Sequence, residues 1–147
     1  MSTEVVQTEQ RKANLDAITR LGFAAYPHKF DTTHTVTQLV EAHGAMPAAQ
    51  LEAAKVQTVT AGRIVRIRSF GKASFFVMSD GRSRPQTYVR QDALTDREYH
   101  LSKLLDVGDQ IGVAGHLFRT KTNELSIWAA QLHFLAKCFL PLPEKWH

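Results

Sequence analysis

The fold is decided by residues 59–78, VTAGRIVRIRSFGKASFFVM. Apolar residues, many of them β-branched or aromatic, recur there at a period of about two, which predicts strands over 59–67 and 74–78. Gly62 interrupts the first strand and is expected to mark a bulge or a sharp bend. Ser79-Asp80-Gly81 is a strong turn signal that ends the second strand. These residues therefore predict a sheet that begins just after Lys55.

The residues downstream extend this pattern. Residues 86–89 form a short third strand, and Thr95 with Glu98 has the spacing of a capping box that opens a helix of about ten residues. Two more strands are expected from the apolar residues Ile111, Val113 and Leu117, then Leu125, Ile127 and Ala129. Three strands, a helix and two strands follow each other in the order of the OB-fold, a five-stranded Greek-key barrel. We therefore expect an α+β chain, mainly β.

The residues upstream have a helical period instead. Leu15, Ile18 and Leu21 recur at helical spacing, and Gly22 stands where a C-terminal cap would. Thr35 with Gln38 predicts a second helix that Gly44 ends, and Pro47 suits the first turn of a third. The predicted organisation is a helical segment over residues 1–55, the barrel over 56–137, and the start of a linker over 138–147.

Composition favours a folded domain with a mild positive charge. The 147 residues are 44% hydrophobic and 22% charged, with a formal net charge of +4. A basic balance is compatible with nucleic acid without proving it. A single cysteine excludes an intrachain disulfide and suits a reducing compartment. Because no apolar run is long enough for a membrane span or a signal peptide, we expect a cytoplasmic protein with no membrane partner.

Nothing in the sequence predicts chemistry by this chain alone. No two of the seven histidines have a metal-ligand spacing, and there is no cysteine pair to join them. Neither a nucleophile elbow nor a phosphate-cradling glycine loop is present. The sequence therefore predicts no catalytic residue, no metal site and no cofactor.

A binding surface is better supported, because cations and aromatic rings alternate on the predicted strands. Such a pattern on an OB-type sheet is typical of single-strand binding, in which cations meet phosphates and bases stack on rings. Phe75 and Phe76 must face opposite ways, so one fills the barrel and the other can be a stacking platform. The cations concerned are Arg63, Arg66, Arg68, Lys72, Arg82, Arg84, Arg90, Arg119 and Lys121.

Stacking alone does not choose a base, so donors and acceptors are needed beside the platform. Gln86 offers both, and Glu124 accepts from an N–H group. Arg68 or Arg119 can donate to a base carbonyl or hold a phosphate.

Several short strings follow one another along the chain: Ala61-Gly62-Arg63-Ile64, Gly71-Lys72-Ala73-Ser74-Phe75, Asp106-Val107-Gly108-Asp109, Phe118-Arg119-Thr120-Lys121-Thr122, Glu124-Leu125-Ser126 and Pro141-Leu142-Pro143-Glu144-Lys145-Trp146-His147. In order and spacing they resemble a known family, bacterial-type class II lysyl-tRNA synthetase. The resemblance runs from about Arg11 to His147, and its closing string is its most specific part.

The resemblance implies a role for the barrel in reading the U-rich anticodon of lysine tRNA. It implies that Phe75 stacks on the central base, that Arg68 and Gln86 read that base, and that Glu124 with Arg119 nearby contacts the first position. Arg63, Lys72 and Lys121 are expected to add phosphate contacts.

Three positions depart from the family pattern. Asn123 replaces a glycine but tolerates a left-handed turn. Pro85 removes a backbone donor before Gln86. Leu140 replaces an arginine, with no consequence that we can argue.

The family's catalytic domain, which uses ATP and Mg²⁺, would follow His147. The resemblance thus implies that this chain alone is not an enzyme but belongs to a lysine–tRNA ligase, a homodimer, whose isolated barrel is expected to be a monomer. A freestanding, sequence-tolerant OB-fold binder of single strands and a dimerisation module remain open as alternatives. An end at a domain junction favours a piece of a longer enzyme.

Overall fold

The computed structural model describes residues 3–24 and 30–139, so most of the expected linker over 138–147 lies outside the described residues. Three helices precede the sheet: α1 (Thr3–Arg20), α2 (Val36–His43) and α3 (Ala48–Ala54). The sheet then runs through β1 (Gln57–Phe70), β2 (Ala73–Ser79), β3 (Gln86–Arg90), β4 (Gln110–Arg119) and β5 (Leu125–Ala136), with α4 (Asp96–Leu104) between β3 and β4. Both predicted capping boxes are present, at Thr35 and Thr95.

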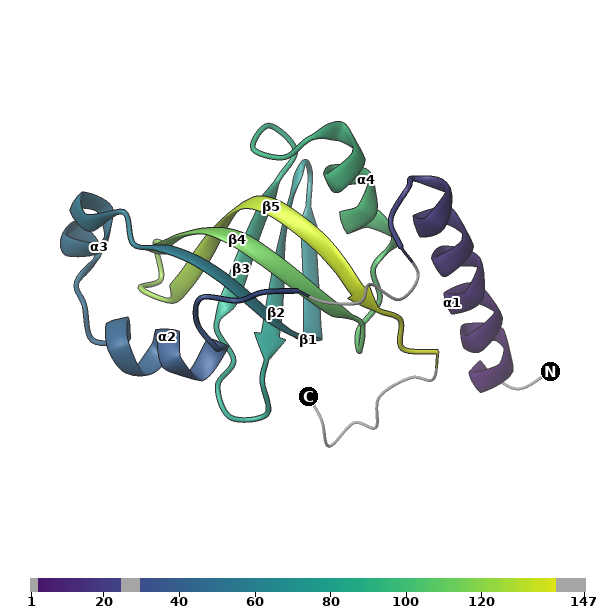
Figure 1. Ribbon diagram of the computed structural model, residues 1–147, viewed down its shortest axis with the longest axis horizontal. Helices are drawn as coiled ribbons and strands as arrows, with labels where there is room; N and C mark the ends of the chain where they lie inside the picture. Colours follow the sequence, from purple (N-terminus) through teal and green to yellow (C-terminus); the bar gives the residue numbers. More distant parts are fainter. Residues whose placement is uncertain (1–2, 25–29, 140–147) are drawn as a thin grey trace.

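The strands close into a barrel in the order β1-β2-β3-β5-β4 (Figure 1). All neighbours are antiparallel except β3 and β5, which pair in parallel. The long strand β1 closes the barrel because its first half pairs with β4 and its second half with β2. The predicted five-stranded OB-fold with preceding helices is therefore confirmed.

Of the bulge or sharp bend expected at Gly62, the bulge is wrong, because the register shift of β1 falls between Ile64 and Arg66. Gly62 is regularly paired with Ile111, and a side chain there would approach Met78 Cβ at 3.3 Å. The glycine thus permits close packing, while the bulge lets the consecutive residues Ile64 and Val65 both be buried.

The core lies inside the barrel and continues under α4. Phe76 is fully buried there, whereas Phe75 on the opposite face of β2 is half-buried, as strand alternation predicted. Helix α4 closes one end of the barrel with its buried Leu101. Among the described residues, no helix is long and apolar enough to cross a membrane.

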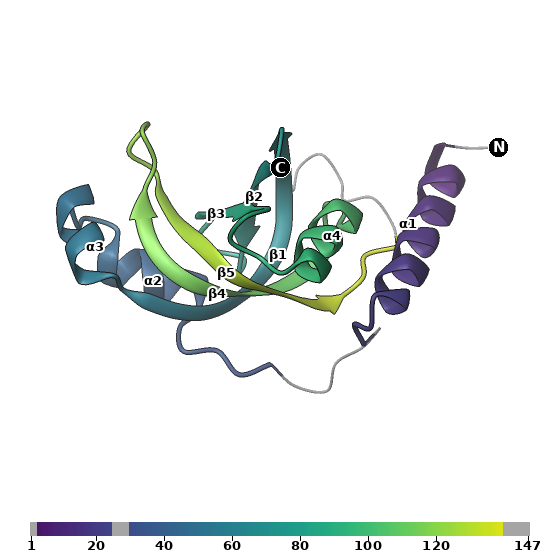
Figure 2. The same cartoon turned by 90° about the horizontal axis from the view of Figure 1, so that it is seen from above.

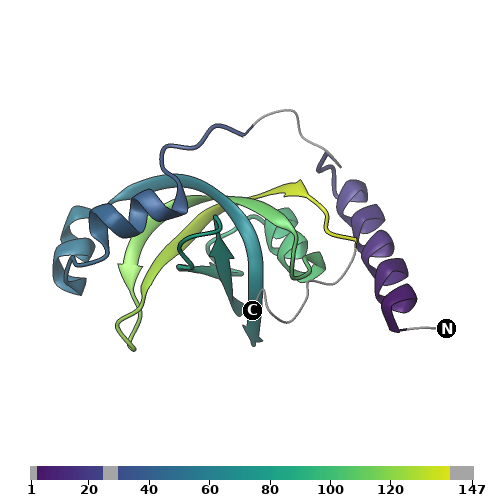
Figure 3. The ribbon, with the colours of Figure 1, turned by 90° about the horizontal axis from the view of Figure 1, so that it is seen from below.

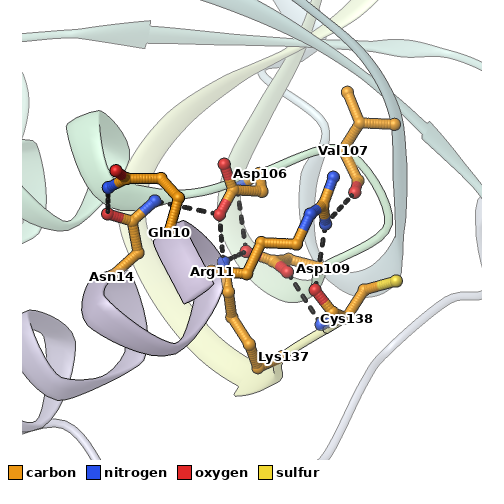
Figure 4. A network of polar contacts seen from close by, with 8 residues as sticks. All are labelled: Gln10, Arg11, Asn14, Asp106, Val107, Asp109, Lys137 and Cys138. Atoms are coloured by element: carbon orange, nitrogen blue, oxygen red, sulfur yellow. Dashed lines mark hydrogen bonds and ion pairs between the residues drawn. The ribbon is translucent and has the colours of Figure 1, made fainter. Parts of the chain in front are cut away.

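A buried polar network holds α1 against the barrel (Figure 4). The Lys137 ammonium at the end of β5 is fully buried and pairs with the carboxylates of Asp106 and Asp109, at 2.8 Å for the latter. From α1, Arg11 donates to the backbone carbonyls of Val107 and Cys138 at 2.8 and 2.9 Å. Helix α1 therefore docks where the chain leaves the barrel.

Helices α2 and α3 lie at the far side of the barrel from α1, whereas α4 lies next to α1 (Figures 1 and 2). Figures 2 and 3 show that the β4–β5 turn and the end of β1 project to the same side, with β2 and β3 between them.

Candidate nucleic-acid interface

One row of direct cross-strand partners crosses the outer face of the barrel. It takes one residue from each strand, and we call it the cross-strand row. In barrel order its members are Arg68, Phe75, Tyr88, Trp128 and His116.

The rings of this row contact each other in sequence. Phe75 and Tyr88 stack with centroids 4.7 Å apart and planes inclined by 26°, and Tyr88 meets Trp128 edge-on at 5.1 Å. His116 lies parallel to Trp128 within 14°, at 5.9 Å. The ring centroid of Phe70, at the tip of β1, lies 5.6 Å from that of Phe75, and Phe70 is 51% exposed. An unbroken aromatic surface therefore reaches solvent across the barrel.

Positive charge borders this surface. The Arg68 guanidinium lies 6.0 Å from the centre of the Phe75 ring, and that of Arg90 lies 5.4 Å from Trp128. Arg90 is also paired with Asp92 at 2.6 Å, whereas Arg68 has no carboxylate partner within the part of the chain described. Aromatic rings beside cations suit bases attached to phosphates.

Two of the residues predicted to contact bases, Gln86 and Glu124, share a pocket next to the row. Gln86 is two residues before Tyr88 on the same face of β3, and Glu124 is exposed just before β5. Both line a shallow pocket of about 350 Å³ together with Pro85 and Leu125. Pro85 does not weaken the sheet, because β3 begins one residue later.

The loop before Gln86 is fixed to α2 by Asp80. One carboxylate oxygen accepts the Thr37 N–H of α2 at 2.8 Å, and the other accepts the N–H groups of Arg82 and Ser83 at 3.0 and 3.1 Å. Burial alone would raise the pKa of the Asp80 carboxyl, but hydrogen bonds to Thr37, Ser83 and Arg82 outweigh it and hold that pKa below its ordinary value. The negative charge of Asp80 also interacts favourably with the dipole at the N-terminus of α2.

Substitution of Asp80 by alanine is therefore expected to destabilise the protein by about 1 kcal/mol, as the loss of a helix cap does. Because the folded-state pKa of Asp80 is lowered, its contribution is complete above the unfolded pKa of about 3.9 and is lost as the pH falls further. Urea unfolding of wild type and Asp80→Ala at pH 7 and pH 3 measures this. An equal difference at both pH values would contradict the assignment.

The Arg119 side chain holds two parts of the fold together. Its guanidinium donates to the carbonyls of Met46 at 2.8 Å, of Asn123 at 3.2 Å, and of Gly44. It thereby fastens the α2–α3 connection to the end of β4, and its predicted contact to a nucleotide stays a prediction.

The three predicted phosphate contacts lie apart from one another. Lys72 in the β1–β2 turn lines a pocket of about 590 Å³ with Tyr88 and Arg90, at the edge of the row. Arg63 lines a different pocket with Arg84, which contains no member of the row. Lys121 is exposed in the β4–β5 turn, where Asn123 adopts the expected left-handed backbone, with φ of 65°.

Four aromatic residues of this surface were missed by the sequence analysis: Tyr88, His116, Phe118 and Trp128. Strand alternation carried a signal for them, because His116 and Phe118 alternate with the buried residue Leu117. Within residues 3–24 and 30–139, no three His, Cys, Asp or Glu side chains form a cluster that could hold a metal ion.

Comparison with known proteins agrees with this geometry. Residues 58–135, almost the whole barrel, match the family model described as an OB-fold nucleic acid binding domain of the tRNA anticodon type. The chain is 44% identical to a lysine–tRNA ligase of Variovorax paradoxus over 84% of its length. It is 36% identical over its whole length to one of Anaeromyxobacter dehalogenans, and 39% identical over 94% to one of Chromobacterium violaceum.

The chain spans only 24%, 30% and 27% of these three relatives. The matched portion is their N-terminal, anticodon-binding part, and the match does not extend to a catalytic portion. With its barrel, its aromatic face and these relatives, the chain belongs to the OB-fold nucleic acid binding family, as the anticodon-binding domain of the bacterial lysine–tRNA ligase type.

Proposed function

We propose that the outer face of the barrel binds the U-rich anticodon loop of lysine tRNA. The observation that carries this proposal is the cross-strand row, in which stacked rings lie between Arg68 and His116 and beside the pocket of Gln86 and Glu124. A splayed-out loop offers bases for such rings and phosphates for the cations around them.

In this proposal Phe75 stacks on the central base, while Arg68 and Gln86 read its edge. Uridine presents two carbonyl acceptors with an N–H donor between them. The Gln86 amide can accept from that donor and donate to one carbonyl. Arginine has donors only, so Arg68 can satisfy O4 of uridine but not the amino group that cytosine carries at the same place.

Glu124 would contact a neighbouring base across the pocket that it shares with Gln86. A carboxylate accepts from an N–H and has nothing to donate, so it favours a base that turns its donor toward the pocket. Asp80 supports this arrangement, because it fixes the loop that leads into Gln86.

The test is a fluorescence titration with a lysine-type anticodon stem-loop and a copy whose central U is changed to C. An unsatisfied donor in a desolvated site costs about 1–3 kcal/mol, so the U form should bind about 5- to 150-fold more tightly. Because this preference rests on base contacts, it should persist when salt is raised, while both affinities fall.

Equal, salt-sensitive binding of the two stem-loops would contradict anticodon reading. It would instead favour a sequence-tolerant binder of single strands, which the rings and cations alone would support.

The proposal extends to the protein of which such a domain is part. The relatives are named lysine–tRNA ligases, and by this likeness the chain would serve a cytoplasmic, homodimeric, ATP- and Mg²⁺-dependent ligase that joins lysine to its tRNA. The barrel would contribute tRNA choice, and none of the reacting groups.

A further inference from the structure

The cross-strand row ends at a small pocket between the barrel and α3, away from Phe75 and Gln86. The pocket has a volume of about 240 Å³ and lies where His116 and Trp128 meet the last turn of α3. Its lining combines rings with charged side chains: Glu52, Lys55, His116, Phe118, Arg119 and Trp128.

Lys55 has an unusual backbone at this pocket. It ends α3 in the left-handed conformation, with φ of 49°, and its N–H donates to the Leu51 carbonyl at 2.9 Å. Glycine or asparagine is the usual residue there, because a side chain is strained in this region. Lys55 is exposed and makes no ion pair within the described residues, so apart from the positive charge that it places at the C-terminus of α3 its side chain has no partner in the fold. Strain of this kind points to a use for the side chain.

His116 lines the same pocket, and its ring can still form hydrogen bonds there. Its ring lies parallel to Trp128, and within residues 30–139 neither ring nitrogen makes a hydrogen bond. Burial and the nearby positive charge of Lys55 lower the pKa of His116, so the ring is neutral at pH 7. A neutral imidazole offers one donor and one acceptor, which suits the edge of a base.

We infer that this pocket is a second nucleotide site, which takes one loop nucleotide outside the central anticodon position. Its base would lie against Trp128 and His116, with Glu52 as a further acceptor, and its phosphate would meet Lys55. The inference rests on the proposed function, because Trp128 belongs both to the cross-strand row and to the lining of this pocket.

The experiment uses anticodon stem-loops that each carry one abasic nucleotide, at successive loop positions. They are titrated against the chain, His116→Ala and Lys55→Gly, with Trp128 fluorescence as the readout in a Trp146→Phe background, since the chain has two tryptophans. Lys12→Ala is the matched control, because it removes one exposed charge from α1, on the other side of the barrel.

One loop position other than the central one should weaken binding about fivefold or more when made abasic, as loss of a stacked base does. In His116→Ala the same change should cost clearly less than in the unsubstituted chain, since one of the two rings that hold the base is already gone. Lys55→Gly should remove about one phosphate contact, so that the slope of log affinity against log salt concentration becomes shallower by about 0.7. Lys12→Ala should leave this slope unchanged. The urea midpoint of Lys55→Gly should not fall, because glycine relieves the strain of the left-handed backbone at position 55.

The inference is overturned if no position outside the centre couples to His116, or if Lys55→Gly and Lys12→Ala act alike. Phe75→Ala separates the two proposals, because it should couple to the central base only. Coupling at Phe75 without coupling at His116 would leave anticodon reading standing and remove the second site. Absence of both would remove the proposed function as well.

Discussion

Replacement of Lys137 by alanine is expected to destabilise the protein by about 3–5 kcal/mol, the cost of leaving a buried charge without its partner. The Lys137 ammonium and the Asp109 carboxylate are both fully buried, 2.8 Å apart. Without the lysine, the donors that remain to the Asp109 carboxylate within the described residues are the N–H groups of Asp106 and Cys138, at 2.8 and 2.9 Å. Burial already raises the pKa of Asp109 despite those hydrogen bonds and the lysine. Urea unfolding followed by circular dichroism measures the loss.

The matched control is the double variant Lys137→Met with Asp109→Asn. It removes both charges, keeps the length of the buried chain at 137, and leaves an amide oxygen for one of the backbone donors. At least half of the lost stability should return. If the double variant were as unstable as Lys137→Ala, packing at position 137 and not the unpaired charge would be the cause.

This network matters beyond its energy, because it joins α1 to the end of the barrel. Asn14 of α1 donates to Asp106 at 3.0 Å, and Asp106 also pairs with Lys137. Loss of Lys137 should therefore loosen α1 before it disturbs the aromatic face, which is built from the outward side chains of the strands.

Phe75→Ala is expected to weaken binding of the lysine-type anticodon stem-loop by about 1–3 kcal/mol, roughly 5- to 150-fold, because it removes a stacked base contact. Phe75 is only half-buried and lies outside the core, so the domain should stay folded. The measurement is a titration with the stem-loop, accompanied by circular dichroism to verify the fold.

Phe70→Ala is the control for this prediction. Phe70 belongs to the same face, 5.6 Å from Phe75, but is not a member of the cross-strand row. Phe70→Ala removes a similar apolar area but leaves the stacking platform of Phe75 in place, so the loss of affinity should be less than half of that in Phe75→Ala. Unchanged affinity in a folded Phe75→Ala variant would count against base stacking at this position.

The order of elements and the direction of side chains on each strand could be predicted from the sequence. Phe75 and Phe76 alternate because neighbours on a strand point to opposite faces, a local property. The capping boxes at Thr35 and Thr95 were equally local, since each lies within four residues. Gln86 and Glu124 were candidates because of their donors and acceptors, and the resemblance to the synthetase family gave each a role, although neither residue type is diagnostic alone.

The remainder of the site depends on contacts between distant segments. Arg119 could not be separated from the other cations, because its carbonyl partners at Met46 and Gly44 lie 73 and 75 residues away. The bulge was expected at Gly62 because glycine favours such sites, but Val65 carries it since its side chain is thereby buried.

By itself, the sequence thus determined which elements form, in what order, and which face of each strand is apolar, because period and capping act over a few residues. Only the tertiary structure decided which side chains meet. Parallel pairing of β3 with β5 places Trp128 beside Tyr88, and antiparallel pairing of β5 with β4 adds His116 and brings Lys137 onto Asp109. Register between strands that are distant in the chain is a property of the packed barrel, and no single segment contains it.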